Sequence, residues 1–408
     1  MAARAGTAPL HVMVKPAGPR CNISCAYCYY LEKEGLYPEE RKFRMPGAVL
    51  ESYIRAHIEA QAAAGHGEIT FTWQGGEPTM LGVAYFRRVV ALQRALRPPG
   101  IRIRNALQTN GILVDSEWAE FLKKHDFLVG VSLDGPTRLH DRYRRDRAGR
   151  PTHAAVMRGL ERLKAQSVAF NVLCSVHRHN ALKPGEVYTF LRDAGAQFIQ
   201  FIPIVERLTP EGTLAGPPRP GREEALRPAP WSVSPAAFGK FLCDVFDLWI
   251  RRDVGRVFVQ FFDVQLGLWL GQPSSLCVFA EECGPALALE HNGEVFACDH
   301  YVYPEYRLGR LPGDRLADLA QAPRRREFGR AKARTLVRQC RECAYLFACH
   351  GGCPKHRFAR AADCEWGLNY LCPAYRRFFR HAGPQLEEMA RLVRAGHPAA
   401  QIGASGRG

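Results

Sequence analysis

The sequence has no long apolar run, no hydrophobic leader and no extended basic tract. No stretch of about 18 uncharged apolar residues occurs in its 408 residues, which argues against a transmembrane helix. Its first ten residues, MAARAGTAPL, lack the apolar core of a secretory signal peptide, so we expect a cytoplasmic protein. The formal net charge is +16, but no uninterrupted basic run exceeds three residues. The charge pattern therefore argues against a protein that binds nucleic acid through a basic tract.

Cysteine, by contrast, is abundant. The chain has 14 cysteines, and reducing cytosol rarely supports a disulfide framework, so metal or cluster ligation is the better interpretation. The composition is otherwise that of an ordinary globular protein, with 47% hydrophobic and 24% charged residues. Wholesale disorder is thus excluded, and the length is sufficient for two or three domains.

The first half of the chain repeats a unit of about 30 residues, in which a β-rich run is followed by a turn and an amphipathic helix. The predicted strands cover residues 11–16, 68–74, 103–110, 127–135, 167–176 and 196–205. The predicted helices cover residues 48–64, 85–96, 116–125, 154–166 and 186–194, and a further long helix is expected at 235–252. This alternation predicts an α/β fold with a parallel sheet, either an incomplete barrel or a doubly wound sheet. In both folds, functional residues lie at the carboxyl ends of the strands.

Eleven cysteines fall into two groups. Cys21, Cys25 and Cys28 form a triad in the loop after the first strand. The downstream cysteines are Cys277, Cys283, Cys298, Cys340, Cys343, Cys349, Cys353 and Cys372. Structural zinc takes four protein ligands, so it accounts for the downstream group as two sites but not for the triad, whose loop has no histidine. An iron–sulfur cluster accounts for both groups, and with three thiolates it leaves one iron open for a small molecule.

The remaining cysteines are predicted to have other roles. Cys174 lies in an apolar strand and Cys243 in an apolar helix, so both are expected to be small core residues. Cys364 lies near Cys372 and is the alternative candidate for the ligand role of that residue.

Two motifs resemble known families. The loop CNISCAYCYY resembles the CxxxCxxC loop of the radical S-adenosylmethionine (radical SAM) enzymes. The downstream pattern, C-x5-C-x9-G-x4-C followed by CxxCx5CxxxC and a lone cysteine, resembles the SPASM extension with its two auxiliary [4Fe-4S] clusters. Within that group the sequence is most similar to the anaerobic sulfatase-maturating enzymes, which share the CDH at residues 298–300, the NYLCPAYR-type ending and the QFIP at residues 200–203.

The resemblance implies a fold and its boundaries. The fold would be a partial (β/α)6 TIM-like barrel followed by a cysteine-rich SPASM domain. We predict the barrel at residues 8–231, with a linker or insertion at 209–230 that is rich in Pro and Gly. The SPASM domain would cover residues 232–385, and a C-terminal helix and frayed tail residues 386–408.

It also implies three [4Fe-4S] clusters and S-adenosylmethionine as cofactors. The triad would hold the cluster that binds S-adenosylmethionine. The first auxiliary cluster would take Cys277, Cys283, Cys298 and Cys353, and the second Cys340, Cys343, Cys349 and Cys372. This pairing follows from the resemblance alone, because eight ligands can be divided in many ways.

The contacts to S-adenosylmethionine implied by the resemblance are Tyr27, Gly75, Gly76, Glu77, Ser132, Arg144 and Val205. The GGEP motif at residues 75–78 would let the backbone approach the amino group of the cosubstrate, although an ordinary tight turn has the same sequence. Ser132 resembles the ribose ligand, and Arg144 the arginine that holds the carboxylate, with Arg142 and Arg145 as alternatives. Tyr27 would cover the adenine and Val205 would pack against it, unless Val205 is only a core residue.

Asp299 resembles the aspartate that accepts the proton of the substrate thiol or hydroxyl. The implied reaction is the oxidation of a cysteine or serine residue in a target sulfatase to Cα-formylglycine, in which a 5′-deoxyadenosyl radical removes a β-hydrogen. The expected partners are the sulfatase polypeptide and a low-potential electron donor of the flavodoxin or ferredoxin type, with no nucleic acid and no membrane.

Two other functions remain as alternatives. One is a SPASM-type maturase that introduces a thioether or carbon–carbon crosslink into a ribosomal peptide. Such enzymes often carry an N-terminal peptide-recognition domain, which we expect to be absent because only about ten residues precede the first strand. The other, from a different class, is a zinc-binding nucleic-acid module with a basic surface.

Overall fold

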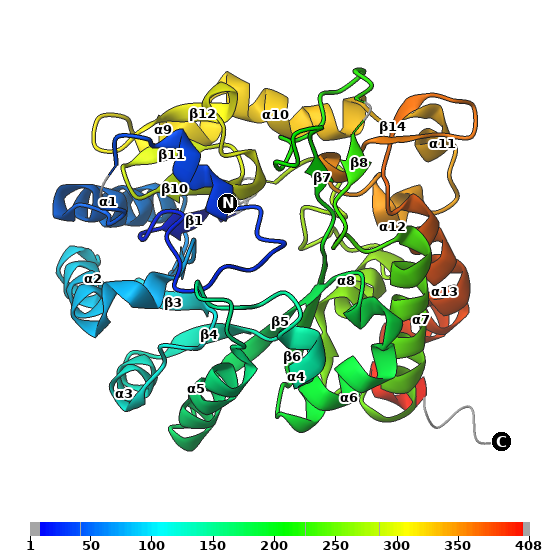
Figure 1. Ribbon diagram of the computed structural model, residues 1–408, viewed down its shortest axis with the longest axis horizontal. Coiled ribbons are helices and arrows are strands. Elements are labelled where there is room, and N and C mark those ends of the chain that lie inside the picture. The colour runs from blue at the N-terminus through cyan, green and yellow to red at the C-terminus, as the bar shows by residue number, and fades with distance from the viewer. Residues whose placement is uncertain (1–8, 41, 225, 285, 403–408) are drawn as a thin grey trace, which may run out of the picture. The chain divides into compact units, whose positions relative to one another are not determined.

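The structure is a computed structural model that describes residues 9–40, 42–224, 226–284 and 286–402. Its contacts divide the chain into two compact units. The first unit consists of Met1–Ser132, Arg144–Phe170 and Pro285–Gly329, and the second of Leu133–Tyr143, Asn171–Gly284 and Arg330–Gly408. Each unit therefore combines segments that lie far apart in the sequence, as the colours of Figure 1 show.

The first unit contains a sheet with the strand order β12-β11-β10-β1-β2-β3-β4. The strands are β1 (His11–Lys15), β2 (Glu68–Trp73), β3 (Arg102–Thr109), β4 (Phe127–Ser132), β10 (Ala286–Glu290), β11 (Glu294–Phe296) and β12 (Arg307–Arg310). Strand β1 pairs in parallel with both β2 and β10, whereas β10, β11 and β12 pair antiparallel. The loops after the parallel strands β1 to β4 consequently meet at one edge of the sheet, where the triad, the GGEP motif and Asn110 lie.

Helices lie outside these strands in Figure 1. They are α1 (Gly47–Ala63), α2 (Val83–Leu96), α3 (Ser116–Lys124), α5 (His153–Ala165) and α9 (Leu316–Gln321), with short 3-10 turns at η1 (Leu31–Leu36), η2 (Pro78–Leu81), η4 (Asp299–Tyr301) and η5 (Pro304–Tyr306).

Strand β2 shows how the sequence pattern determines which side chains form the core. Its residues Ile69, Phe71 and Trp73 alternate with polar ones, and all three are fully buried. The rings of Phe71 and Trp73 also pack on Tyr53 of α1.

The second unit continues the βα alternation with the parallel strands β5 (Phe170–Val176), β6 (Phe198–Pro203) and β9 (Phe258–Val259). Its helices are α4 (Thr137–His140), α6 (Pro184–Asp193), α7 (Pro235–Arg252), α8 (Gln260–Trp269), α11 (Arg338–Arg341), α12 (Leu346–Cys349) and α13 (Cys372–Arg394), with η3 (Asn180–Leu182), η6 (Pro354–His356) and η7 (Ala399–Gln401). Helix α10 (Pro323–Arg334) contains the boundary between the units. Two small antiparallel pairs complete the second unit. One joins β7 (Arg207–Leu208) to β8 (Arg227–Pro228), and the other joins β13 (Ala359–Arg360) to β14 (Trp366–Leu368).

Helices α7 and α13 approach each other closely in the second unit. A Cβ atom at Gly239 would lie 3.0 Å from Cα of Ala374, so glycine permits this approach. The ring of Phe378 on α13 packs against Phe246 of α7 and stacks on Phe262 of α8. A helix long and apolar enough to cross a membrane does not occur among the described residues.

The predicted strands and helices of the first half are confirmed to within a few residues at their ends, and the helix at 235–252 has the predicted bounds. The strands β10, β11 and β12 were not predicted, because they are short and lie in a segment without clear periodicity. The predicted linker at 209–230 contributes to the β7–β8 hairpin. Residues 8, 41, 225, 285 and 403–408 of the predicted domains lie outside the described residues. The predicted boundaries themselves stay a prediction.

A buried polar trio connects two strands and a helix of the first unit. The indole NH of Trp73 donates to Oδ1 of Asn105 at 2.8 Å, and the amides of Asn105 and Gln93 exchange two further hydrogen bonds. All three side chains are almost completely buried. Each buried donor therefore depends on Asn105 or Gln93 for its partner.

We predict that Asn105→Leu lowers the free energy of unfolding by about 2–4 kcal/mol, because Trp73 and Gln93 would both lose their partners inside the core. Urea denaturation followed by tryptophan fluorescence measures the change. The exposed substitution Glu120→Leu on α3 serves as the control for added apolar surface. Equal midpoints for Asn105→Leu and the wild type would contradict the assigned role of the trio.

Candidate active site

The triad loop begins directly after β1 and is held by backbone hydrogen bonds. The amide of Gly18 donates to Lys15 O at 2.9 Å and turns the chain away from the strand. Further along, the amide of Ser24 donates to Arg145 O at 2.8 Å, and Ile23 forms a bridge with Asp146. The loop is thereby fixed against a second loop of the same unit.

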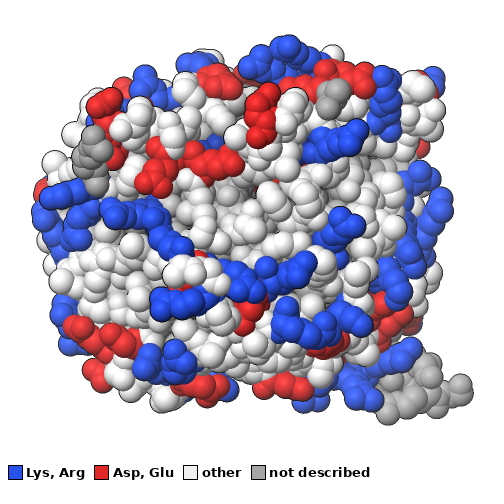
Figure 2. Space-filling view, in the orientation of Figure 1, with Lys and Arg blue, Asp and Glu red and all other residues white. Residues whose placement is uncertain are grey.

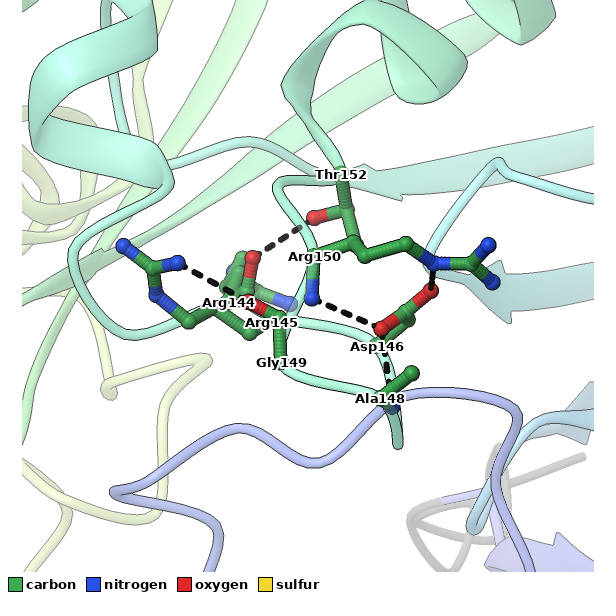
Figure 3. Close-up of polar contacts among 7 residues, drawn as sticks. All are labelled: Arg144, Arg145, Asp146, Ala148, Gly149, Arg150 and Thr152. Atoms are coloured by element: carbon green, nitrogen blue, oxygen red, sulfur yellow. Dashed lines mark hydrogen bonds and ion pairs between the residues drawn. The ribbon is translucent and has the colours of Figure 1, made fainter.

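That second loop, residues 144–152, is stabilised by its own polar contacts (Figure 3). The Asp146 carboxylate accepts hydrogen bonds from the amides of Ala148 and Arg150 and from Nε of Arg150, at 2.6 to 2.9 Å. These hydrogen bonds hold the pKa of Asp146 below its usual range. The hydroxyl of Thr152 donates to Arg144 O at 2.7 Å. The backbone that carries Arg144 is therefore rigid.

The triad sulfur atoms have cationic and amide neighbours. Nδ2 of Asn110, at the end of β3, lies 3.7 Å from Sγ of Cys21, and Nη1 of Arg144 lies 3.9 Å from Sγ of Cys25. Burial raises the pKa of the Cys21 thiol to about 12, and it also raises that of Cys28. Because a metal ligand must be the thiolate, a metal bound here would have to displace these protons.

The predicted cosubstrate residues Tyr27 and Arg144 lie together. The Arg144 guanidinium is 5.6 Å from the centre of the Tyr27 ring, and both side chains are buried. Arg142 and Arg145, the alternatives to Arg144, are exposed. The structure therefore places Arg144, rather than either neighbour, beside the triad.

The GGEP motif packs directly against the triad loop. The amides of Gly76 and Glu77 donate to Gly18 O and Arg20 O at 2.8 and 2.9 Å. A Cβ atom at Gly76 would lie 1.9 Å from Arg20 O, a distance no side chain can adopt. Glycine at this position is thus required for the contact between the two loops, whatever else the motif binds.

The Glu77 side chain is buried, and its carboxylate accepts four hydrogen bonds from the protein. Oε1 accepts from the amide and hydroxyl of Thr79 at 3.0 and 2.6 Å and from the Thr109 hydroxyl at 2.7 Å. Oε2 accepts from the amide of Asn110 at 2.7 Å. Burial raises the pKa of Glu77, while these hydrogen bonds oppose the shift. Glu77 therefore links the GGEP turn to the end of β3, and its predicted contact with the cosubstrate stays a prediction.

Asp299 lies in the same unit, within a group of hydrogen-bond donors and cations. The Tyr29 hydroxyl donates to Oδ2 of Asp299 at 2.9 Å, and Nζ of Lys15 lies 3.9 Å from the same oxygen. Burial on its own opposes ionisation of Asp299, but the positive charges of His300 and Lys15 and the Tyr29 hydrogen bond hold its pKa well below the usual range. Asp299 is consequently an ionised carboxylate, the form that can accept a proton.

Four downstream cysteines of the second unit surround one cavity of about 470 Å³. They are Cys340, Cys343, Cys349 and Cys372, the set that the resemblance assigns to the second auxiliary cluster. Burial, together with the negative charges of neighbouring cysteines of the set, raises the pKa of Cys349 to about 12 and that of Cys372 to about 11. The four thiols therefore lie close enough to interact around one space.

The other downstream set is distributed over both units. Cys277, Cys283 and Cys353 lie in the second unit, where burial and the negative charge of Cys353 raise the pKa of Cys283 to about 12. Cys298 follows β11 in the first unit, and its Sγ lies 3.6 Å from Oδ1 of Asp299. The joint ligation of one cluster by these four residues stays a prediction.

The downstream thiols can be compared with the ligand set of a single metal ion. Over the part of the chain that the structure describes, no three His, Cys, Asp or Glu side chains converge closely enough to ligate one metal ion. A zinc ion needs its sulfur donors about 2.3 Å from the metal. Thiols arranged around a cavity, as at Cys340 and Cys372, suit a larger group such as a four-iron cluster better.

The remaining predicted residues lie as follows. Ser132 ends β4, and its hydroxyl accepts a hydrogen bond from Nε2 of Gln108 at 3.2 Å. Val205 is a buried residue of the second unit. Cys174 and Cys243 are buried, as expected for core residues, whereas Cys364 is exposed.

Three residues around the first unit's site were not assigned roles from the sequence. Asn110 contacts Cys21, and Lys15 and Tyr29 contact Asp299. Lys15 and Asn110 lie at strand ends, which was a usable signal, and Tyr29 directly follows Cys28. None of these positions indicates its contact partner from sequence spacing alone.

Comparison with known proteins identifies two families. A model of the radical SAM superfamily matches residues 16–181, which include the triad and the GGEP motif. A SPASM model, described as an iron–sulfur cluster-binding domain, matches residues 281–344. The sequence is 43% identical to a serine-type anaerobic sulfatase-maturating enzyme of Bacteroides thetaiotaomicron, over 93% of this chain and 91% of that protein. It is 31% identical to a cysteine-type enzyme of Clostridium perfringens, over 95% and 100%.

Solved structures agree with these matches. The structure of native anSMEcpe with bound AdoMet and the Cp18Cys peptide has a TM-score of 0.81 and 32% identity, and covers 94% of this chain and 99% of that one. Streptococcus suis SuiB, bound to its precursor peptide SuiA, has a TM-score of 0.61 at 14% identity over 89% and 76% of the two chains, which shows a shared fold only. The predicted fold class, a partial barrel with a SPASM domain, is thereby confirmed.

We predict that Glu77→Gln weakens iron binding by the triad about 10- to 100-fold, the usual effect of losing a residue that orients a ligand. One of the two acceptor oxygens would become an NH2 group that faces backbone or hydroxyl donors. Iron and sulfide analysis with EPR spectroscopy measures the change. Glu68→Gln, at an exposed position of β2, is the matched control. Unchanged triad iron in Glu77→Gln would refute the role assigned to this carboxylate.

Proposed function

The chain belongs to the anaerobic sulfatase-maturating enzymes of the radical SAM superfamily, and on that premise we propose that it oxidises a cysteine or serine residue of a sulfatase to Cα-formylglycine. One observation supports this assignment most directly. The hydroxyl of Tyr29, which follows the triad residue Cys28, donates a hydrogen bond to Oδ2 of Asp299 at 2.9 Å. A single hydrogen bond thus connects the triad loop to the carboxylate that would accept the substrate proton.

The residues of the first unit fit the cofactors of this family. The triad would hold a [4Fe-4S] cluster, and Arg144, Tyr27 and the GGEP turn would receive S-adenosylmethionine. When bound, the two would supply a 5′-deoxyadenosyl radical that removes a β-hydrogen from the substrate residue. The buried Arg144 and Tyr27 side chains are suited to exclude water from that chemistry.

Asp299 would accept the proton of the substrate thiol or hydroxyl. Lys15, which is almost fully buried at the end of β1, keeps the carboxylate ionised, and the Tyr29 hydroxyl fixes the position of Oδ2. A general base must be ionised and oriented before substrate arrives, and the contacts of Lys15 and Tyr29 with Oδ2 support this role for Asp299.

Three finer features are part of the proposal. The chain would carry three [4Fe-4S] clusters, because the eleven grouped cysteines supply three, four and four ligands. Its electrons would be exchanged with a low-potential protein of the flavodoxin or ferredoxin type. We place the enzyme in the cytoplasm, where a reducing environment keeps ligand thiols from forming disulfides.

The other candidate functions have less support. Similarity to the peptide-bound protein SuiB is limited to the fold. On the face drawn in Figure 2, Lys and Arg side chains are interspersed with Asp and Glu side chains, which does not favour a nucleic-acid-binding surface. We therefore retain a sulfatase polypeptide as the proposed substrate.

We predict about twelve irons per chain after anaerobic reconstitution, as three four-iron clusters require. The variant Cys21→Ala/Cys25→Ala/Cys28→Ala should retain about eight, and Cys340→Ala/Cys343→Ala should lose the second auxiliary cluster only. Cys174→Ala, at a buried core cysteine, is the control and should keep the full content. About eight irons in the wild type would refute the proposed count.

We predict that the holoenzyme, given a reductant and S-adenosylmethionine, oxidises peptides containing CxPxR or SxPxR. Asp299→Asn should slow peptide oxidation about 10²- to 10⁴-fold, because its amide cannot accept the proton. Mass spectrometry of the peptide and chromatography of 5′-deoxyadenosine measure the two products separately. Asp318→Asn, an exposed aspartate of α9, is the matched control.

The two readouts separate the parts of the proposal. Formylglycine in either peptide supports the function and also identifies the preferred residue. Deoxyadenosine without oxidation of either peptide would leave radical chemistry in place but refute the sulfatase substrate. Full peptide oxidation by Asp299→Asn would refute the assignment of the base.

A further inference from the structure

Two buried cations of the second unit have no role in the function proposed above. Lys332 is only 1% exposed and Arg357 only 6% exposed. Among the described residues, neither forms an ion pair with a carboxylate. A buried charge without a counter-charge is unfavourable by several kcal/mol. These two cations therefore need negative charge from another source.

Lys332 holds the loop that carries the first cysteine of the downstream group. Its Nζ donates to Cys277 O at 2.6 Å, to Val278 O at 3.0 Å and to Ala280 O. The ammonium group has three N–H donors, and three carbonyl oxygens of one loop accept from it. Lys332 thus lies within the loop between Cys277 and Cys283.

Arg357 holds the loop between two other cysteines, Cys349 and Cys353. Its Nη2 donates to His350 O at 3.0 Å and its Nε to Gly351 O at 3.1 Å. His350 and the two glycines that follow it all have positive φ, between 45° and 69°, a conformation that needs external support at the histidine. The guanidinium supplies that support to the loop that joins the two ligand sets.

A hydrogen bond also joins the two residues, since Nη1 of Arg357 donates to the backbone carbonyl oxygen of Lys332 at 2.6 Å. Burial lowers the pKa of both groups, and the charges that oppose this shift belong to cysteines. For Lys332 they are Cys283, Cys353 and Cys277. For Arg357 they are Cys340, Cys353, Cys283 and Cys349, from both ligand sets. Both cations thus lie against the loops of the downstream cysteines, whose sulfur atoms would become negative once they ligate a cluster.

We propose that Lys332 and Arg357 compensate the negative charge of the two auxiliary iron–sulfur clusters and raise their reduction potentials, with Arg357 acting on both clusters. This inference rests on the proposed function in one respect only, namely that the downstream cysteines hold iron–sulfur clusters. Lys332 and Arg357 would act on the clusters through the ligand loops that they contact.

Elementary electrostatics gives the direction in which the two cations shift the reduction potential. Reduction adds one electron to a site that already carries the charge of its thiolates. A fixed positive charge nearby in a low-dielectric environment stabilises the reduced form more than the oxidised one. Loss of either cation therefore lowers the potential, and loss of Arg357 should lower it for both clusters.

Redox titration of the holoenzyme monitored by EPR tests this inference. In Arg357→Gln and Lys332→Met, the ratio of reduced to oxidised auxiliary cluster at a fixed ambient potential should fall at least tenfold, a shift of 59 mV for a one-electron couple. Arg357→Lys and Lys332→Arg keep the charge and should remain within a small fraction of that shift. Arg391→Gln, an exposed arginine of the same unit, is the control for loss of a surface charge.

Each outcome is decisive. Equal potentials in the charge-removing variants and the wild type would overturn the inference, as would equal shifts in Arg357→Gln and Arg357→Lys, because hydrogen-bond geometry would then be responsible. If the charge-removing variants fail to hold iron, iron content replaces the potential as the readout. Retention of iron by the charge-keeping variants then supports charge compensation, and loss of iron from both types refutes it.

This test is independent of the substrate. A holoenzyme that oxidises no sulfatase peptide but shows the predicted shifts would refute the proposed function and leave the inference standing. Conversely, normal peptide oxidation with unshifted potentials would refute only the inference.

Discussion

The site of the first unit depends on the hydrogen bonds that the buried Glu77 carboxylate accepts. It joins the GGEP turn to Thr109 and Asn110 at the end of β3, and Asn110 in turn reaches Cys21. The same turn contacts the triad loop through the backbone at Gly76. Because these contacts share one acidic side chain, the position of the triad and the position of the strand ends are not independent. A change at any one of these hydrogen bonds is therefore expected to shift the others.

Buried thiolates pose the same physical problem in both units, and each unit places cations beside them. In the first unit the cation is Arg144, next to Cys25. In the second unit Lys332 and Arg357 contact the carbonyl groups of the ligand loops. Because carbonyl oxygens accept hydrogen bonds from Lys332 and Arg357, these two side chains cannot change rotamer easily. The charge around the ligand loops is therefore fixed before any iron is bound, which reduces the reorganisation that electron transfer requires.

The sequence was informative where the signal is periodic or chemically rare. Strands such as β2 alternate apolar and polar residues, and eleven grouped cysteines have few interpretations. Strands β10 to β12 were missed because they are short and because β10 pairs with β1, which lies far away in the chain. Lys332 was missed for a different reason. It lies in the basic segment APRRREFGRAKAR, where only tertiary burial distinguishes it from surface cations.

The placement of Asp299 shows how residues next to ligands can position a catalytic group. Asp299 follows Cys298, and its partner Tyr29 follows Cys28. A ligand cysteine has little freedom once its metal is bound, so the residue after it inherits a fixed backbone position. The hydrogen bond between Tyr29 and Asp299 then joins two such positions. Lys15, on a strand of the same sheet as the strand before Cys298, fixes the charge state of the carboxylate. Orientation and ionisation of the base are thus set by separate residues, which is why loss of the tyrosine hydroxyl and loss of the lysine charge have different physical consequences at the same oxygen.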